Sequence, residues 1–267
     1  MYPRMGLFPY KTENTLKGIA ETLDSLFETL YINKYFEEKK EEFAAEQEAW
    51  NNTFEAWSQE NPELRKQWDA FYSDKPTAEV ADVEFNATDK MATRAAGGKV
   101  LNMMVDRYAN MVGGSADLAG PNKTDLKNGN GIYSAENPLG RTVEFGIREF
   151  AMSALCSGMR LHGGLRPFCA TFLVFADYLR PQLRVASLMK LPLIYIFTHD
   201  SIYVGEDGPT HQPVEVLASL RAIPGVQVLR PGDAQETAEA WNMAMESTDH
   251  PVCIVLTRQD LQGYEKE

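Results

Sequence analysis

No apolar stretch of this sequence is long enough to cross a membrane. The best candidate, residues 191–197, has the length of a strand, whereas a membrane-spanning helix needs about 20 apolar residues. The N-terminus begins Met1-Tyr2-Pro3-Arg4 and lacks the apolar core of a secretory signal peptide. We therefore expect no membrane association and a cytoplasmic location.

Cysteine is scarce, and basic residues are outnumbered by acidic ones. Cys156, Cys169 and Cys253 stand far apart among apolar neighbours and form no Cys-x-x-Cys pair, which predicts buried free thiols in a reducing compartment. Lys and Arg number 26 against 38 Asp and Glu, and the net charge of −12 argues against a nucleic-acid-binding protein. Residues 1–90 carry 10 basic and 19 acidic side chains, so most of the acidity belongs to an N-terminal extension.

Apolar residues at helical spacing dominate residues 12–73. In the first part of this region they are Leu16, Ile19, Leu23, Leu26, Phe27 and Leu30. Asn61-Pro62 predicts the start of a second helix, because proline is favoured in a first helical turn. We interpret this acidic part as a structural linker or docking arm. Residues 74–89 show no clear period and are predicted to be an extended connector.

From residue 92 onward, short apolar runs alternate with helical patterns. Strands are predicted at residues 111–112, 142–145, 167–170, 192–198, 226–229 and 252–257, and helices at 93–109, 148–162, 172–190, 210–222 and 234–247. This alternation predicts an α/β fold with a parallel β-sheet and helices on both faces. We therefore expect two domains, an acidic helical extension (1–90) and an α/β domain (91–267).

The densest group of chemically active side chains follows the most apolar strand. Residues 199–213 read HDSIYVGEDGPTHQP and place two histidines and several carboxylates in one loop that leads into a helix. Ligands of parallel sheets bind beyond the carboxyl ends of the strands, and a helix N-terminus favours anions. The sequence therefore predicts a ligand site in this loop.

This loop resembles the transketolase segment H-D-S-I-x-x-G-E-D-G-P-T-H-Q-P, and other motifs of that family follow in the same order. They are Gly113-Gly114-Ser115-Ala116-Asp117-Leu118, Gly146-Ile147-Arg148-Glu149-Phe150, Leu161-His162-Gly163-Gly164 with Thr171-Phe172-Leu173-Val174-Phe175, and Thr257-Arg258-Gln259. The match covers residues 92–260, which correspond to the central domain of the family. That domain binds the aminopyrimidine ring of thiamine diphosphate. The resemblance implies an enzyme of the pentose phosphate pathway that moves two-carbon ketol units between sugar phosphates.

The resemblance also implies roles for individual residues. Glu149 and His211 would be catalytic: Glu149 would hydrogen-bond N1′ of the aminopyrimidine ring, and His211 would contact the oxygens of the ketol unit. Asp207 would distinguish the hydroxyl configuration at C2 of the acceptor sugar. The other implied cofactor contacts are Asp117 and Leu118 at the thiazolium ring and Phe172, Phe175 and Tyr178 at the pyrimidine ring. The implied substrate-phosphate contacts are Arg94, His199 and Arg258.

The family's metal motif, Gly-Asp-Gly with an asparagine, has no counterpart here. Residues 206–208 and 232–234 are the nearest segments, and neither fits. We therefore expect no metal ligands on this chain. A diphosphate-binding domain or subunit would hold Mg²⁺ or Ca²⁺, and the chain would be a half-site within a dimer or another homo- or hetero-oligomer.

Pro121 stands where the family usually has a serine that contacts the substrate phosphate. Two alternatives remain open at the level of sequence. Either a neighbouring side chain such as Asn122 or Thr124 replaces that serine, or phosphate recognition is weaker than in relatives.

Other functions stay possible on the sequence alone. A non-catalytic binding or regulatory module derived from a thiamine enzyme would explain the absent metal motif. Dihydroxyacetone synthase and 1-deoxyxylulose-5-phosphate synthase use the same cofactor. The latter would carry Asp-Arg-Ala-Gly where this chain has His199-Asp200-Ser201-Ile202, and it therefore ranks behind transketolase.

Overall fold

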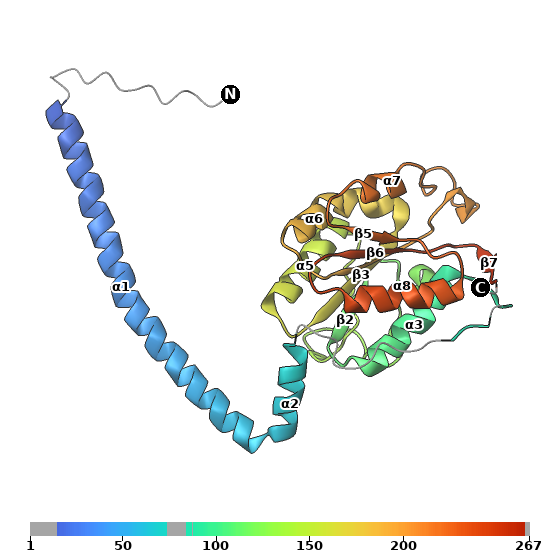
Figure 1. Ribbon diagram of the computed structural model, residues 1–267, viewed down its shortest axis with the longest axis horizontal. Helices are drawn as coiled ribbons and strands as arrows, with labels where there is room; N and C mark the ends of the chain where they lie inside the picture. The colour runs from blue at the N-terminus through green and yellow to red at the C-terminus, as the bar shows by residue number, and fades with distance from the viewer. Residues whose placement is uncertain (1–14, 74–83, 87, 265–267) are drawn as a thin grey trace. The chain divides into compact units, whose positions relative to one another are not determined.

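The computed structural model describes residues 15–73, 84–86 and 88–264 (Figure 1). The chain divides into two compact units between Arg65 and Lys66. The predicted connector at residues 74–89 lies mostly outside the described residues. The domain boundary expected after residue 90 stays a prediction.

The first unit consists mainly of the long helix α1 (Thr15–Glu60), followed by the start of α2 (Pro62–Phe71). Both helices agree with the sequence pattern. Trp50, Phe54 and Trp57 stack along one side of α1, with ring centroids 5.0 and 5.7 Å apart. The guanidinium of Arg65 lies over the Phe54 ring at 4.7 Å, so local contacts stabilise the end of this unit.

The second unit is built on a five-stranded parallel sheet with the order β2-β3-β4-β6-β5 (Figure 1). The strands are β2 (Met111–Ser115), β3 (Arg166–Phe172), β4 (Ile194–Thr198), β5 (Gln227–Leu229) and β6 (Val252–Val255). One face of the sheet is covered by α3 (Thr93–Arg107) and α8 (Ala234–Glu246). The other face is covered by α5 (Glu149–His162), α6 (Ala176–Leu188) and α7 (Val216–Arg221). The predicted α/β fold is confirmed.

Alternating side chains of the strands build two separate cores. In β4, Ile194 and Ile196 pack with α3 and α8, whereas Tyr195 and Phe197 pack with α5, α6 and α7. This alternation follows from the two-residue period of a strand. It explains why the strands read as continuous apolar runs in the sequence, because both faces of the sheet are buried.

All three cysteines are free and buried, as predicted. Cys169 and Cys253 point into the core beneath α5 and α6, where burial raises the pKa of both thiols. Among the described residues, no helix is both long and apolar enough to span a bilayer.

Several predicted boundaries were wrong. Residues 142–145 form no strand: Thr142 makes only isolated bridges to Gly113 and Ile132. The helix predicted at 210–222 begins at Val216, after Pro209 and Pro213, which lack backbone donors. The helix predicted at 172–190 begins at Ala176, because β3 extends through Phe172 and a 3₁₀ turn, Leu173–Phe175, follows it.

Three further elements were not predicted. The strands β1 (Lys90–Ala92) and β7 (Asp260–Gln262) pair antiparallel, and the short helix α4 (Ala119–Asn122) follows β2. The β1–β7 pair joins segments that are far apart in the sequence. It brings the start of α3 close to the chain that follows β6, and thereby positions part of the candidate site.

Gly163 and Gly164 of the Leu-His-Gly-Gly motif have a structural role. Both residues have positive φ angles, 88° and 78°, which favour glycine. A Cβ atom at Gly163 would lie 2.9 Å from the ring of Tyr72, which packs against this turn. The exposed ring of His162 makes only a 3.4 Å contact, to the Gly163 carbonyl. The motif therefore shapes the turn between α5 and β3.

Candidate functional site

The resemblance motifs meet at the carboxyl edge of the sheet. Asp117 follows β2, Phe172 ends β3, His199 follows β4 and Arg258 lies shortly after β6. Because β2, β3, β4 and β6 are consecutive neighbours in a parallel sheet, their carboxyl ends lie side by side. The fold thus gathers residues that are up to 164 positions apart in the sequence, as Thr93 and Thr257 show.

Phe172 is the centre of an aromatic cluster. The His199 ring stacks on it with a centroid distance of 3.6 Å, and the Phe175 ring lies nearly parallel to it at 5.9 Å. His211 meets Phe172 and Phe175 edge-on, at 6.1 and 5.4 Å. Tyr178 contacts Phe175 at 6.1 Å, but 64% of its surface is exposed. The structure therefore brings together five of the predicted site residues.

A reciprocal threonine pair positions the two arginines of the site. The backbone N–H of Thr257 donates to Oγ1 of Thr93 at 2.7 Å, and the N–H of Thr93 donates to Oγ1 of Thr257 at 3.0 Å. Arg94 and Arg258 follow these threonines directly. Burial, and next the charge of Arg258, lower the pKa of Arg94, so the two guanidiniums share one basic patch.

Neighbouring oxygens orient both guanidiniums. Arg94 Nη1 donates to the carbonyl of Pro121 at 2.8 Å. Arg258 Nη2 lies 3.5 Å from Oε1 of Glu206, and the charge of Asp207 acts on Arg94. Asp207 itself is exposed in the loop. Pro121 therefore takes part in the patch through its backbone oxygen, although it has no hydroxyl group.

His199 is buried and has a left-handed backbone conformation, with φ of 57°. Burial, followed in order by the charges of Arg94, Arg258 and His211, lowers the pKa of its imidazole from 6.5 to about 4. The ring is consequently neutral at neutral pH. It can offer one N–H donor and one acceptor nitrogen to its surroundings.

Glu149 is the first residue of α5, and only 8% of its surface is exposed. The turn before it is held by Gly146, with φ of 66°, and by Arg148 Nη1, which donates to the Phe145 carbonyl at 3.0 Å. Within the part of the chain that the structure describes, the Glu149 carboxylate forms no hydrogen bond or ion pair. The carboxylate is therefore open to a partner from a ligand.

Asp117 lines a separate cavity of about 520 Å³ at the β2 edge, together with Ser115, Glu144 and Arg148. Its φ of 59° lies in the left-handed region, and its side chain is exposed. Leu118 is half-buried before α4 and does not line this cavity. The structure thus places Asp117 near the turn that carries Glu149.

One of the alternatives for Pro121 is contradicted. Asn122 and Thr124 are both buried, and their side chains form hydrogen bonds inside the protein. Asn122 contacts Ser115 and Thr198, and Thr124 contacts Ser115 at 2.7 Å. Neither side chain is available to replace the hydroxyl group that proline lacks.

The sequence analysis missed a buried ion pair beside the site. The Asp200 side chain has no exposed surface, and its Oδ2 accepts from Nε and Nη2 of Arg230 at 2.8 and 2.7 Å. This pair fixes the start of the 199–213 loop to the chain that follows β5. The sequence offered one signal, a carboxylate directly after an apolar strand.

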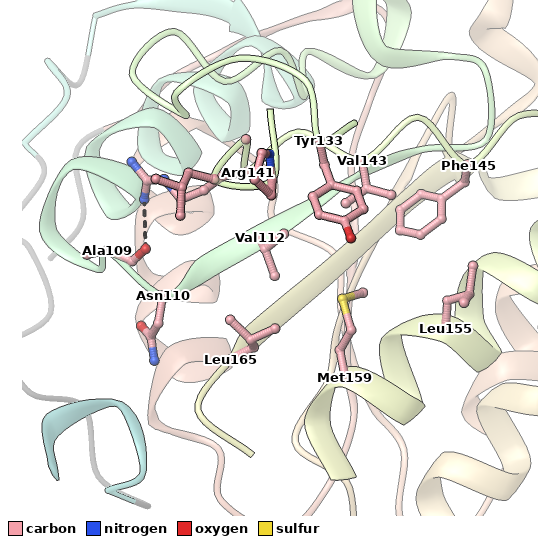
Figure 2. Close-up of a pocket in the computed structure, with 13 residues that line it drawn as sticks. Ala109, Asn110, Val112, Tyr133, Arg141, Val143, Phe145, Leu155, Met159 and Leu165 are labelled. Carbon is pink, nitrogen blue, oxygen red and sulfur yellow. Dashed lines mark hydrogen bonds between the residues drawn. The ribbon is translucent and has the colours of Figure 1, made fainter. Parts of the chain in front are cut away.

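An apolar cavity lies away from the aromatic cluster. It has a volume of about 560 Å³ and lies between the edge strand β2, the loop that carries Tyr133 and Arg141, and helix α5 (Figure 2). Leu155, Met159 and Leu165 form its wall on the α5 side. None of the predicted site residues lines it. The Arg141 guanidinium is directed away from the cavity, because it donates hydrogen bonds to backbone carbonyls that include that of Ala109.

Metal ligands were not expected on this chain. In the described ranges, no group of three or more His, Cys, Asp or Glu side chains could hold a metal ion. Asp233, in the Gly-Asp-Ala segment, instead caps α8: its Oδ1 accepts from the Glu236 N–H at 2.7 Å.

Comparison with known proteins identifies the family that this chain matches. Residues 89–263 match the family described as transketolase, pyrimidine binding domain. The transketolase of Treponema pallidum is 50% identical over 247 residues, which are 91% of this chain and 37% of that protein. The transketolase of Bacillus subtilis is 50% identical over 224 residues, 83% of this chain and 33% of that protein.

Solved structures give the same result. Transketolase from Leishmania mexicana has a TM-score of 0.79 and 38% identity, covering 82% of this chain and 33% of that one. The transketolase of Pichia stipitis in complex with sedoheptulose-7-phosphate has a TM-score of 0.78 and 36% identity. The match covers 83% of this chain and 34% of that one. The chain therefore spans about a third of the length of the relatives it matches.

Proposed function

The chain belongs to the family of transketolase pyrimidine-binding domains, and from this premise we propose that it supplies the aminopyrimidine half of a thiamine diphosphate site. The assembled enzyme would transfer two-carbon ketol units between sugar phosphates. The observation that carries this proposal is the joining of Phe172, His199, His211 and the Arg94–Arg258 patch at one sheet edge.

The residues present fit the aminopyrimidine ring. Glu149 is largely buried as a residue and its carboxylate has no hydrogen-bond or ion-pair partner among the described residues, so a ring nitrogen that carries or shares a proton would give it one. Phe172 and Phe175 offer nearly parallel rings, with an interplanar angle of 9°, as a stacking surface. When bound, thiamine diphosphate would supply the carbon nucleophile that carries the two-carbon unit.

The remaining roles follow the resemblance to transketolases, residue by residue. Glu149 holds a proton at N1′, and Phe172, Phe175 and Tyr178 stack on the pyrimidine. His211 hydrogen-bonds the oxygens of the ketol unit, and its edge-on contacts with two phenylalanines support a fixed ring orientation. Asp117 and Leu118 contact the thiazolium.

Substrate recognition uses the other predicted residues. Arg94 and Arg258 bind the phosphate by charge-assisted hydrogen bonds, with His199 beside them. Asp207 contacts the C2 hydroxyl of the acceptor. Burial, and next the charge of Arg258, lower the pKa of Arg94, so an anion in this patch would relieve the repulsion between the two guanidiniums.

The diphosphate end of the cofactor needs residues that we do not assign to the described part of this chain. We propose that a diphosphate-binding domain, in the same polypeptide or in a partner subunit, holds it together with Mg²⁺ or Ca²⁺. The relatives are about three times as long as the matched region, which supports this division of labour. A cytoplasmic location and a dimeric assembly belong to the same proposal.

The test is to combine the chain with a diphosphate-binding transketolase domain and to measure two quantities. One is ketol transfer from a ketose phosphate to an aldose phosphate, and the other is proton exchange at C2 of bound thiamine diphosphate. We expect Glu149→Gln to suppress both by about 100-fold or more, because an amide cannot manage the proton at N1′. Glu239→Gln, an exposed position on α8, is the matched control.

Wild-type exchange in Glu149→Gln would remove this residue from the mechanism. Cofactor binding without ketol transfer would favour the related enzymes, dihydroxyacetone synthase or 1-deoxyxylulose-5-phosphate synthase, which can be assayed with their own substrates. Absence of cofactor binding in every combination would favour a non-catalytic binding module.

A further inference from the structure

Five buried polar side chains, linked by hydrogen bonds, form a relay that ends at the imidazole of His199. Thr124 Oγ1 lies 2.7 Å from Ser115 Oγ, and Asn122 Nδ2 donates to Ser115 Oγ at 3.0 Å. Thr198 Oγ1 donates to Asn122 Oδ1 at 2.5 Å and lies 2.8 Å from His199 Nδ1. All five residues are buried, so these groups have only one another as partners for most of their hydrogen bonds.

The two distances to the Asn122 amide define its orientation. A separation of 2.5 Å from Thr198 Oγ1 is within the range of an O–H···O bond and is shorter than the ~2.7–3.2 Å of N–H···O bonds. The separation of 3.0 Å from Ser115 Oγ is normal for an N–H donor. The amide oxygen therefore faces Thr198, and the amide nitrogen faces Ser115.

This orientation determines where the imidazole proton sits. A threonine hydroxyl has a single proton, and Thr198 donates it to Asn122. Toward His199, Thr198 Oγ1 can then only accept, so Nδ1 must carry the hydrogen. Because burial and the nearby positive charges lower the pKa of His199 to about 4, the neutral ring has no second proton at neutral pH. Its Nε2 is left with a lone pair, and it forms no hydrogen bond within the described residues.

We propose that Asn122 is a positioning residue that fixes His199 as the Nδ1–H tautomer, so that Nε2 meets a ligand as a hydrogen-bond acceptor. The consequence for substrate rests on the proposed function. His199 accepts a hydrogen bond from an O–H group, either a sugar hydroxyl or a singly protonated phosphate. The charge of a fully ionised phosphate is met by Arg94 and Arg258 and not by His199.

A second Thr-His pair in the same site provides an internal control. Thr210 Oγ1 lies 2.8 Å from His211 Nδ1, which is the same contact as in the first pair. Thr210 is exposed, and its hydroxyl has no other partner in the described part of the chain. It can rotate to donate or to accept, so no relay fixes the tautomer of His211.

The experiment is nitrogen-15 NMR of the full chain labelled at histidine, without cofactor, at about pH 7. The chain has four histidines, so the spectrum is simple, and His199→Asn identifies the signals of His199. Asparagine is chosen because it tolerates the positive φ at this position. We expect the wild-type spectrum to show a protonated Nδ1 and an unprotonated Nε2. A protonated Nε2 would overturn the proposal without any variant.

Three variants then test Asn122 as the cause. Asn122→Leu frees the Thr198 hydroxyl to donate to Nδ1, so the protonated Nδ1 population should fall at least about twofold. Asn122→Asp keeps an acceptor toward Thr198 and should retain the wild-type tautomer. Thr210→Val should leave His199 unchanged. An unchanged tautomer in Asn122→Leu would mean that Asn122 does not set it. If Asn122→Leu does not fold, Thr198→Val removes the hydroxyl oxygen that accepts the Nδ1 hydrogen, and retention of the protonated Nδ1 there would contradict the relay.

Failure of this inference can be distinguished from failure of the proposed function. The NMR measurement requires neither thiamine diphosphate nor substrate. A protonated Nδ1 that responds to Asn122, in a chain that shows no ketol transfer in any assembly, would support the relay and reject the activity. The opposite pair of results would reject the relay alone.

Discussion

The helices α1 and α8 have the same kind of sequence pattern but differ in how far their apolar side chains are buried. Both have apolar residues at helical spacing, and both are helices. In α1 the apolar side chains are largely exposed, and Phe27 keeps 69% of its surface. In α8 the Trp241 side chain is completely buried between α3 and the sheet. Helical periodicity therefore predicts a helix in each case, but it does not predict burial.

The largest contrast between the two helices should be the cost of removing an aromatic ring. We expect Trp241→Ala to lower the free energy of unfolding of the α/β unit by about 4 kcal/mol, because it leaves a cavity in the core. Phe27→Ala should leave that free energy unchanged. Urea unfolding followed by near-ultraviolet circular dichroism, to which the buried Tyr108 and Tyr195 contribute, would measure both. Equal losses would show that α1 is as strongly coupled to the core as α8.

The loss of stability on breaking an ion pair should likewise be larger in the α/β unit than in α1. Arg230→Met leaves the fully buried Asp200 carboxylate without its partner, and we expect a loss of about 3 kcal/mol. Lys34→Met breaks an exposed 3.9 Å contact with Glu38 in α1 and should have no measurable effect. The same unfolding assay applies. A small effect of Arg230→Met would mean that the loop moves and exposes Asp200 to water.

The pH dependence of stability should also come from the α/β unit, which contains all four histidines. The pKa of His199 falls from 6.5 in the unfolded chain to about 4 in the folded one, so the unfolded state binds more protons between these values. Its contribution is fully present above about pH 6.5 and is lost as the pH falls. We expect a loss of about 2 kcal/mol between about pH 7 and pH 5.

His199→Asn provides the check on this pH effect. It removes the titrating group and should flatten the stability profile in the same pH range. Urea unfolding at a series of pH values would measure the slope. A slope that is unchanged in His199→Asn would assign the pH dependence to other groups.

The smallest expected contrast concerns helix ends. Asp233 caps α8 through the Glu236 N–H, and Glu236 Oε2 accepts in return from the Gly232 N–H at 2.7 Å. We expect Asp233→Ala to cost about 1 kcal/mol. Gln47→Ala, which removes an exposed 2.9 Å contact with Asn51 inside α1, should change the unfolding of the α/β unit by less than the error of the measurement.

Sequence patterns predicted the sheet well but the segments between strands poorly. The strands of the sheet are short apolar runs whose two faces are both buried, and such runs are recognisable locally. Residues 142–145 have the same local character, but they form only isolated bridges beside the sheet. The antiparallel pair of β1 and β7 depends on residues that lie more than 160 positions apart, so no local pattern could reveal it.

The candidate site likewise has features that the sequence predicted and features that it could not predict. The motifs named its residue types and their order, and the parallel topology was enough to predict that these loops meet at one edge. The stacking of His199 on Phe172, the Thr93–Thr257 pair and the buried partner of Asp200 could not be predicted, because each joins separate loops. Asn122 illustrates the difference: the sequence left a ligand contact open as one of two alternatives, and the structure shows a buried link to Thr198.

The sequence by itself determined the helices, the alternation that makes the parallel sheet, the buried thiols and the family of the α/β domain. Each of these depends on local spacing, on side-chain chemistry or on a motif within a few tens of residues. Only the tertiary structure decided which polar groups are buried together, and therefore the neutral state of His199 and the contact of its Nδ1 with Thr198. Burial and hydrogen-bond direction depend on neighbours from distant parts of the chain, and these become defined only when the strands assemble.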